Sequence, residues 1–222
     1  MTIPLLFIEG GIGCGKSTLV KHMKDYCTEN NYKYLTIQEP VDIWTEIKDK
    51  NEVNIIEAFY NDQHKYGFHF QMMAYISRLQ RLQESFNKAQ NENYDFIICE
   101  RSLYTDKHVF CQMLYDEGKI DEYGFKIYNQ WFDYFQTSFD NTSFVYLKTD
   151  FNVCYERVKK RQRSGENCID IEYLKQNNQY HDNWLEKERN VLFLDGNQDC
   201  EENKDLLNQY CDIILYFMKN KK

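Results

Sequence analysis

Short apolar runs alternate with longer polar and amphipathic stretches along this chain. The runs are five to seven residues long, consist mainly of Leu, Ile, Val, Phe and Tyr, and show no strict alternation of apolar and polar positions. Continuous runs of this kind are typical of parallel strands that are covered on both faces. The predicted strands are 3–9, 34–38, 95–99, 143–148 and 191–195.

The segments between these strands have the character of helices, and the longest predicted helix lies near residues 64–90. Strands that alternate with helices favour an α/β fold with a parallel sheet. We therefore predict a central five-stranded parallel sheet flanked by helices. A chain of 222 residues usually forms one domain, and no repeat, linker or low-complexity tract divides it, so a single domain over 1–222 is expected.

Composition and charge narrow the classes of function. Hydrophobic residues make up 42% of the chain, enough for a folded core. The formal net charge of −8 argues against nucleic-acid binding over the whole surface, so any phosphate chemistry must rest on local positive charge. No apolar run approaches the ~20 residues of a membrane span. Neither a nucleic acid nor a membrane is therefore an expected partner.

The cysteines and the start of the chain bear on its compartment. The eight cysteines form no CxxC pair and no zinc spacing, which favours reduced thiols. The chain begins almost directly with a predicted strand and shows no signal or transit peptide pattern. We therefore expect a cytoplasmic protein.

A glycine-rich segment, GGIGCGKST at residues 10–18, carries the first recognisable chemistry. It matches the pattern G-x-x-x-x-G-K-[ST], follows a predicted strand and opens a predicted helix. In such a loop backbone N–H groups surround phosphate oxygens, Lys16 reaches the β- and γ-phosphates, and Ser17 ligates Mg²⁺. The residues expected to bind ATP here are Gly10, Gly11, Ile12, Gly13, Cys14, Gly15, Lys16, Ser17 and Thr18.

The loop by itself leaves two classes open, a phosphotransferase acting on a small molecule and a GTPase switch or motor ATPase. A GTPase normally carries an N-K-x-D motif, which is absent, and a motor favours a strand that ends in Asp, whereas the third predicted strand is followed by Glu100 and Arg101. Acids stand at or just after the carboxyl ends of predicted strands, namely Glu9, Glu39 and Glu100. Because ligands of parallel sheets bind at that edge, these acids are predicted to lie near a ligand.

Several segments together resemble the deoxynucleoside kinase family in their order and spacing. They are IEGGIGCGKST, EPVDIW, FHFQ, SRLQ, ERSLYTD, KKRQRSGE and IEYL, and the resemblance extends from Ile8 to about Asp199. It implies a P-loop kinase fold with an Arg-rich lid at about 157–168. It also implies transfer of the γ-phosphoryl of ATP, with Mg²⁺, to the 5′-hydroxyl of a deoxyribonucleoside, and a homodimer formed through long helices, here 64–90 and 121–138.

The same resemblance gives roles to the acids at the strand ends. Glu39 is the expected general base for the 5′-hydroxyl, and Arg101 is expected to hold both Glu39 and the 5′-oxygen. Glu100 is expected to join Ser17 in binding Mg²⁺. A purely structural alternative is that Glu39 caps a turn before Pro40 while Glu100 pairs with Arg101. The expected catalytic set is Glu39, Arg101, Lys16, Arg161 and Arg163.

A basic run, RVKKRQR at residues 157–163, stands out in an acidic chain. A run of charges is ordinarily a solvated helix face, but the resemblance makes this one a lid whose arginines close over the triphosphate. In the same comparison Glu166 and Tyr60 contact the sugar 3′-hydroxyl, and Asp199 lies near the adenine. The lid arginines are Arg157, Arg161 and Arg163.

One face of the long predicted helix suits the recognition of a nucleobase. Gln71, Ala74 and Arg78 share that face, and the Gln71 amide can both donate to and accept from a base edge. Arg78 needs an acidic partner if it is buried, and Asp106 is the candidate. An ionised Asp only accepts hydrogen bonds, so it favours an exocyclic amino group over the carbonyl of thymine. A structural ion pair between two helices is the alternative.

The family resemblance agrees with this base preference. Its thymidine-preferring members have an apolar residue in place of Arg78 and a small one in place of Asp106, so this chain resembles the branch for deoxycytidine and deoxypurines. Trp44, Phe70 and Phe110 match aromatic residues that sandwich the base.

Two departures and two rival functions qualify the comparison. Gly11 stands where many relatives have Asn, and Cys14 stands where a small Ala or Ser is common. The main rival function is a nucleoside monophosphate kinase of the thymidylate kinase type, which would need extra cations for the acceptor's own phosphate. Here Glu39 on the acceptor side would repel that phosphate. A non-catalytic nucleotide-binding subunit is the remaining alternative.

Overall fold

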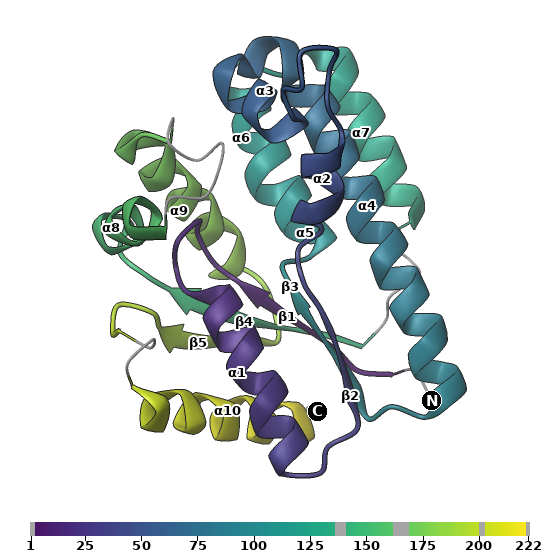
Figure 1. Cartoon of the computed structure of the whole chain (residues 1–222), viewed down its shortest axis with the longest axis vertical. Helices are drawn as coiled ribbons and strands as arrows, with labels where there is room; N and C mark the ends of the chain where they lie inside the picture. The colour runs from purple at the N-terminus through teal and green to yellow at the C-terminus, as the bar shows by residue number, and fades with distance from the viewer. Residues whose placement is uncertain (1–2, 136–140, 162–168, 200–202, 221–222) are drawn as a thin grey trace.

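The computed structural model describes residues 3–135, 141–161, 169–199 and 203–220 (Figure 1). The strands are β1 (Leu5–Glu9), β2 (Tyr34–Ile37), β3 (Phe96–Glu100), β4 (Thr142–Lys148) and β5 (Val191–Asp195). The helices are α1 (Lys16–Glu29), α2 (Val41–Glu46), α3 (Ile55–Asn61), α4 (Gln63–Glu92), α5 (Leu103–Thr105), α6 (Gln112–Asp116), α7 (Glu122–Phe135), α8 (Phe151–Arg161), α9 (Ile171–Leu185) and α10 (Lys204–Lys219). A π-helical turn, η1 (Asp106–Cys111), joins α5 to α6.

The strands of the described residues form one five-stranded sheet in the order β2-β3-β1-β4-β5, with every neighbouring pair parallel. The α/β fold with a central parallel sheet is therefore confirmed. Parallel strands present their carboxyl ends at one edge, and the register pairs Ile8 of β1 with Glu100 of β3. Glu9 and Glu100 consequently reach the same edge, and Glu39 follows β2 there.

Side chains of the central strands alternate between two hydrophobic clusters, one on each face of the sheet. Leu5 and Phe7 of β1 belong to the cluster that includes residues of α2, α3, α4 and α7. Leu6 and Ile8 belong to the other cluster, with residues of α1, α8 and α10. Figure 1 shows the corresponding layers, with α4 and α7 on one side of the sheet and α1 and α10 on the other. Burial on both faces explains why the strands are continuously apolar.

The long predicted helix is present as α4. Asp62 caps its start, because the Asp62 side chain accepts a hydrogen bond from Lys65 N at 3.1 Å. Asn93 closes it in the left-handed conformation, with φ of 55°. The helix predicted over 121–138 is seen as α7, and residues 136–138 lie outside the described residues.

The segment after β3 differs from a plain helix. Asp106 opens the π-helical turn η1 instead of continuing α5. Such turns insert an extra residue and occur often at functional sites, because they redirect side chains. Apolar periodicity predicts a helix here but does not distinguish the wider turn.

Among the described residues, no helix is both long enough and apolar enough to span a bilayer.

Gly13 lies against α8 so closely that substitution should be costly. Its φ is +83°, and a Cβ atom there would be 2.5 Å from the carbonyl oxygen of Cys154 and 2.9 Å from Val158 Cγ2. We expect Gly13→Ala to lower the free energy of unfolding by about 2–4 kcal/mol, since overpacking adds to the left-handed strain.

The matched control is Gly118→Ala. Gly118 has φ of +70°, but a Cβ atom at this position would meet nothing within 4 Å. This variant should therefore lose only the ~1–2 kcal/mol of the left-handed strain. Urea denaturation of both variants measures the difference. Equal losses in the two variants would contradict the close packing of the loop against α8.

Candidate active site

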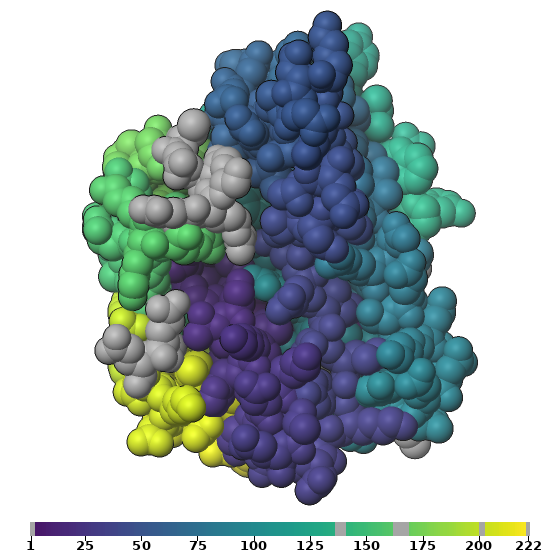
Figure 2. Space-filling model, viewed as in Figure 1, coloured from purple at the N-terminus to yellow at the C-terminus, as the bar shows by residue number. Residues whose placement is uncertain are grey.

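A cavity of about 870 Å³ lies at the carboxyl edge of the sheet. It falls within the volume range of small-molecule sites. Figure 2 shows the surface hollowed between the segment that carries α8 and α9 and the segment that carries α2 and α3. The phosphate loop, the ends of β2 and β3, and one face of α4 all contribute residues to its wall.

The phosphate loop forms one wall of this cavity. Gly13 and Gly15 have φ of 83° and 104°, conformations that residues with a Cβ rarely adopt. Lys16 is the first residue of α1, so the positive end of the helix dipole adjoins the loop. The predicted loop residues that line the cavity are Ile12, Gly13, Cys14, Gly15, Lys16, Ser17 and Thr18.

The remaining two predicted residues of the loop, Gly10 and Gly11, contribute their carbonyl groups. Lys16 Nζ donates to Gly10 O at 3.0 Å and to Gly11 O at 2.8 Å, and it lies 3.6 Å from Cys14 Sγ. Burial lowers the pKa of Lys16, and the nearby Arg101 guanidinium lowers it further. A buried ammonium group at this position is suited to an anionic phosphate partner.

Packing explains why position 11 is glycine. Asn178 of α9 lies against Gly11 and occupies the space that a side chain would need. The Asn178 amide is itself held, because its Nδ2 donates to Thr149 O at 2.7 Å. An asparagine side chain at position 11 would collide with this amide.

Ser17 and Glu100 bring two oxygen atoms together beside the loop. Ser17 Oγ donates to Glu100 Oε1 at 2.5 Å. Mg²⁺ prefers oxygen ligands and usually takes only one or two from protein, with phosphate oxygens and water completing its shell. These two side chains therefore fit the predicted Mg²⁺ site.

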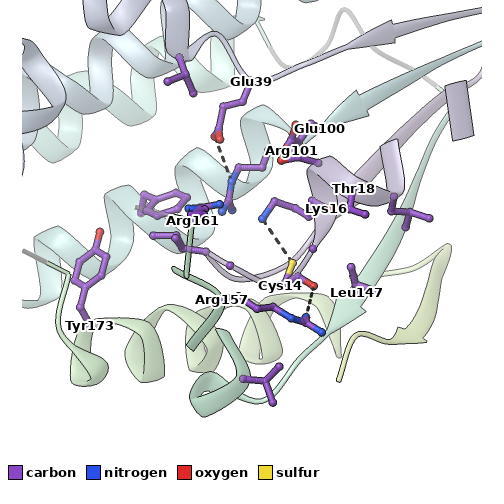
Figure 3. Close-up of a pocket in the computed structure, with 18 of the residues that line it drawn as sticks. Cys14, Lys16, Thr18, Glu39, Glu100, Arg101, Leu147, Arg157, Arg161 and Tyr173 are labelled. Carbon is purple, nitrogen blue, oxygen red and sulfur yellow. Dashed lines mark hydrogen bonds and ion pairs between the residues drawn. The ribbon is translucent and has the colours of Figure 1, made fainter. Parts of the chain in front are cut away.

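Arg101 is fixed both by its backbone and by its side chain. Its φ of +64° lies in the left-handed region, which costs about 1–2 kcal/mol for a residue with a Cβ. The guanidinium lies over the Phe110 ring, 4.9 Å from the centroid. Its Nε is 3.2 Å from Glu39 Oε1, and its Nη1 is 3.4 Å from His181 Nε2. Figure 3 shows the Glu39 carboxylate turned toward Arg101.

Two arginines contact the same carboxylate oxygen of Glu39. Arg78 Nη2 and Arg101 Nε lie 3.0 Å and 3.2 Å from Glu39 Oε1. Burial by itself would raise the pKa of Glu39, but Arg101, Arg78 and Lys16 lower it to about 2. The carboxylate is therefore ionised at neutral pH.

Arg78 connects Glu39 to Asp106. Arg78 Nε donates to Asp106 Oδ2 at 2.8 Å and Nη2 donates to Asp106 Oδ1 at 3.3 Å, a paired contact between side chains that are 6% and 2% exposed. Burial raises the pKa of Asp106, and the Arg78 guanidinium opposes that rise. The structure thus brings the predicted pair together, and it adds the bridge to Glu39.

The far end of the cavity is aromatic. Trp44 and Phe70 meet edge to face with centroids 5.3 Å apart, and both line the cavity with Gln71 and Ala74. Gln71 is 2% exposed, and its Oε1 has no hydrogen-bond partner within the described residues. An unpaired buried oxygen costs about 1–3 kcal/mol, which a donor on a bound ligand would relieve. Phe110 also lines the cavity, but its ring packs on Arg101.

Three residues predicted to contact ATP also line the cavity, namely Arg157, Arg161 and Asp199. Arg157 donates to backbone carbonyls, from Nη1 to Cys14 O at 3.2 Å and to Gly196 O at 2.8 Å, and from Nη2 to Gln198 O at 2.9 Å. It therefore braces the loop against the segment after β5, an arrangement that the basic run does not reveal. The predicted Arg163 and Glu166 lie outside the described residues.

Helix α9 contributes residues that the sequence patterns do not single out. Tyr173 lines the cavity opposite the predicted Tyr60, with ring centroids 6.2 Å apart. Asn177 and His181 are 0% exposed and contact the phosphate loop and Arg101. Their spacing of four residues marks one helix face, but polar residues at that spacing usually indicate a solvated face, so the sequence offers only this weak signal.

Residues 6–215 match the family described as Deoxynucleoside kinase. The chain belongs to the deoxynucleoside kinase family. It is similar to the probable deoxycytidine kinase of fowlpox virus (strain NVSL), with 33% identity over 80% of this chain and 70% of the relative.

Two further relatives illustrate the range of the family. Deoxycytidine kinase 2 of Gallus gallus is 30% identical over 95% of this chain and 89% of its own length. The mitochondrial thymidine kinase 2 of Homo sapiens is 27% identical over 95% of this chain and 77% of its own length. The protein is accordingly a deoxynucleoside kinase, a phosphotransferase of a family that uses ATP. The GTPase, motor and non-catalytic alternatives are set aside by this membership.

The charge on Glu39 predicts an acid-dependent contribution to stability. Its pKa is lowered in the folded state from 4.5 to about 2. The contribution of this carboxylate to the free energy of unfolding is therefore fully present above about pH 5. It is lost as the pH falls from 4.5 toward the folded-state pKa of about 2. We expect the difference in unfolding free energy between the wild type and Glu39→Gln to narrow by about 1–2 kcal/mol from pH 5 to pH 3.

Urea denaturation at several pH values measures this difference. Glu122 pairs with Lys126 on the surface and its side chain is 67% exposed, so Glu122→Gln serves as the control and should show little pH-dependent change. If the difference in unfolding free energy between wild type and Glu39→Gln stays constant from pH 5 to pH 3, the lowered pKa of Glu39 is contradicted.

Proposed function

We propose that this deoxynucleoside kinase transfers the γ-phosphoryl of ATP to the 5′-hydroxyl of a deoxyribonucleoside, and that it prefers deoxycytidine, deoxyadenosine or deoxyguanosine to thymidine. The supporting observation is a carboxylate, Glu39, that two arginines hold in the same cavity as Lys16 of the phosphate loop. A carboxylate suits a neutral hydroxyl acceptor, whereas it would repel the phosphate of a nucleoside monophosphate.

Glu39 has a defined part in this reaction. Arg78 and Arg101 both bind Oε1, so Oε2 is the oxygen that accepts the proton of the 5′-hydroxyl. A carboxylate with a pKa of about 2 is a weak base, and it therefore orients the hydroxyl for most of the reaction and takes the proton late. This order suits the loose transition state of phosphoryl transfer, in which positioning contributes more than deprotonation.

The cationic residues stabilise charge on the phosphates and on the 5′-oxygen. Lys16 exchanges its carbonyl partners for the β- and γ-phosphates, and Arg101 holds the 5′-oxygen beside Glu39. Mg²⁺, held by Ser17 and Glu100, would neutralise phosphate charge when bound. The lid arginines expected to add to this stabilisation are Arg157, Arg161 and Arg163.

The remaining predicted contacts concern the nucleoside and the adenine. Asp106, paired with the Arg78 guanidinium, accepts from the exocyclic amino group of the base and repels the carbonyl of thymine. Trp44, Phe70 and Phe110 enclose the base, while Tyr60 and Glu166 bind the 3′-hydroxyl. Gln71 and Ala74 line the base edge, and Asp199 lies near the adenine.

Initial rates with Mg-ATP test the reaction and the base preference together. The acceptors are deoxycytidine, deoxyadenosine, deoxyguanosine, thymidine, dCMP and dTMP. We expect turnover of amino-bearing nucleosides, and we expect Asp106→Ala to lower their kcat/KM by about 10- to 100-fold, since a buried charged hydrogen bond is lost.

Asp133→Ala is the matched control, because Asp133 pairs with Lys107 on the surface with 58% exposure. It should leave kcat/KM unchanged. Turnover of thymidine alone would overturn the role given to Asp106, and turnover of the monophosphates alone would overturn the acceptor assignment.

We also propose a homodimer formed through α4 and α7, which lie side by side in Figure 1. Large apolar side chains on these helices are exposed, with Trp131 at 46% and Tyr134 at 76%. A stripe of this kind on one helix face favours an interface with a second apolar surface. The exposed residues concerned are Ile76, Tyr123, Ile127, Trp131 and Tyr134.

Sedimentation velocity tests the dimer. The wild type should sediment as a dimer at micromolar concentration, and Trp131→Glu should shift it to the monomer because a buried unpaired charge is costly. Tyr216→Glu on α10, where Tyr216 is 70% exposed, is the control and should remain dimeric. A monomeric wild type would contradict the proposal.

A reducing compartment such as the cytoplasm suits the thiols of the described residues. Cys14, Cys27, Cys99, Cys111 and Cys211 are buried and free of disulfides, as is Cys154. The cytoplasmic placement stays a prediction.

A further inference from the structure

His181 is a fully buried histidine beside Arg101 that has no part in the reaction proposed above. It is 0% exposed. Its Nε2 lies 3.4 Å from Arg101 Nη1, and its Nδ1 lies 2.7 Å from the carbonyl oxygen of Asn177. A guanidinium nitrogen can only donate and a carbonyl oxygen can only accept. The two partners therefore fix the tautomer, with the proton on Nδ1 and the lone pair of Nε2 turned toward Arg101.

Packing holds the ring in this orientation. Tyr146 of β4 stacks on it with centroids 6.2 Å apart and planes 11° apart, and Phe110 of η1 meets it edge to face at 6.5 Å. Burial lowers the pKa of His181 well below its usual value, and the cations of Arg101 and Lys16 lower it further. The neutral ring is thus the form that accepts a hydrogen bond from Arg101.

The same helix also holds the phosphate loop. Asn177 lies one turn before His181, and its Oδ1 accepts from Ile12 N at 3.3 Å. A connected set of hydrogen bonds therefore runs from Ile12 through Asn177 and His181 to Arg101. The loop follows β1 and Arg101 follows β3, so α9 joins two parts of the site that different strands supply.

We propose that His181, as its Nδ1–H tautomer, is a positioning residue for Arg101. Helix α9 thereby fixes Arg101, which holds the acceptor hydroxyl, relative to the phosphate loop. The proposal rests on the proposed function, because it requires Arg101 to act on the acceptor hydroxyl. Glu39 binds Nε of the guanidinium and His181 binds Nη1, so the planar group is held at two positions. Transfer between two bound molecules depends on such alignment, since a displacement of 1 Å can cost about 100-fold in rate.

The tautomer can be tested on the wild-type protein without any activity. Long-range ¹H–¹⁵N correlation spectra of the histidine side chains distinguish a protonated ring nitrogen from a bare one, and His181→Gln assigns the signal among the five histidines. We expect a proton on Nδ1, a bare Nε2 and no titration between pH 6 and pH 8. A proton on Nε2, or titration within that range, would overturn the proposal.

Kinetics of two variants then test the positioning role. His181→Gln offers an amide oxygen near the position of Nε2, whereas His181→Asn can still donate to Asn177 O but is too short to reach Arg101. We expect His181→Asn to lower kcat by about 10- to 100-fold with little change in the KM for ATP. His181→Gln should recover a large part of that loss.

Thermal denaturation and a control separate this role from simple stability. Trp184→Phe alters another buried residue of α9 and should leave kcat unchanged. If both His181 variants lose kcat equally and in proportion to their Tm, His181 is only structural and the proposal fails. If His181→Asn does not fold, the spectra and His181→Gln still decide. A wild type that phosphorylates no nucleoside refutes the proposed function, while the spectra still report the tautomer.

Discussion

The mutual neutralisation of buried charges at the carboxyl edge of the sheet is the constraint on which the site depends. Arg78 and Arg101 have side chains only 6% and 3% exposed, and Glu39 and Asp106 are their partners. Isolated charges at such depth would cost several kcal/mol each, whereas paired and hydrogen-bonded charges are tolerated. Removing one member would therefore leave another uncompensated. The geometry of the cavity follows from keeping this set together.

Local backbone features serve that arrangement. Arg101 has an unfavourable left-handed backbone conformation, and its side chain contacts Glu39. The π-helical turn η1 begins at Asp106, the residue whose carboxylate pairs with Arg78. Both deviations lie at the carboxyl edge of the sheet. There the ion pairs between buried side chains can offset the backbone strain.

Much of the fold could be predicted from the sequence, because its determinants are local. The strands are continuous apolar runs because both of their faces are buried, and this pattern predicts them. The sequence also predicts α4 as one long helix. The phosphate loop was identifiable because its glycines are required by backbone conformation, and Arg78 with Asp106 was identifiable because a buried arginine needs an acid.

The rest depends on contacts between residues far apart in sequence. Nothing near Arg78 indicates that its guanidinium also reaches Glu39, and nothing near His181 indicates that it faces Arg101. The π-helical turn has no compositional mark that separates it from an ordinary helix. Glycine at position 11 becomes intelligible only when Asn178 is seen against it.

The bridge that Arg78 forms between Asp106 and Glu39 has a consequence for how such an enzyme could diverge. In the proposed reaction, Arg78 supports Asp106, which selects the base, and also Glu39, which binds the acceptor hydroxyl. An exchange of Arg78 that admits a new base would therefore alter the charge balance around Glu39 at the same time. The proposed roles would therefore couple substrate range to turnover, so a lineage that changes one is expected to need compensating substitutions for the other.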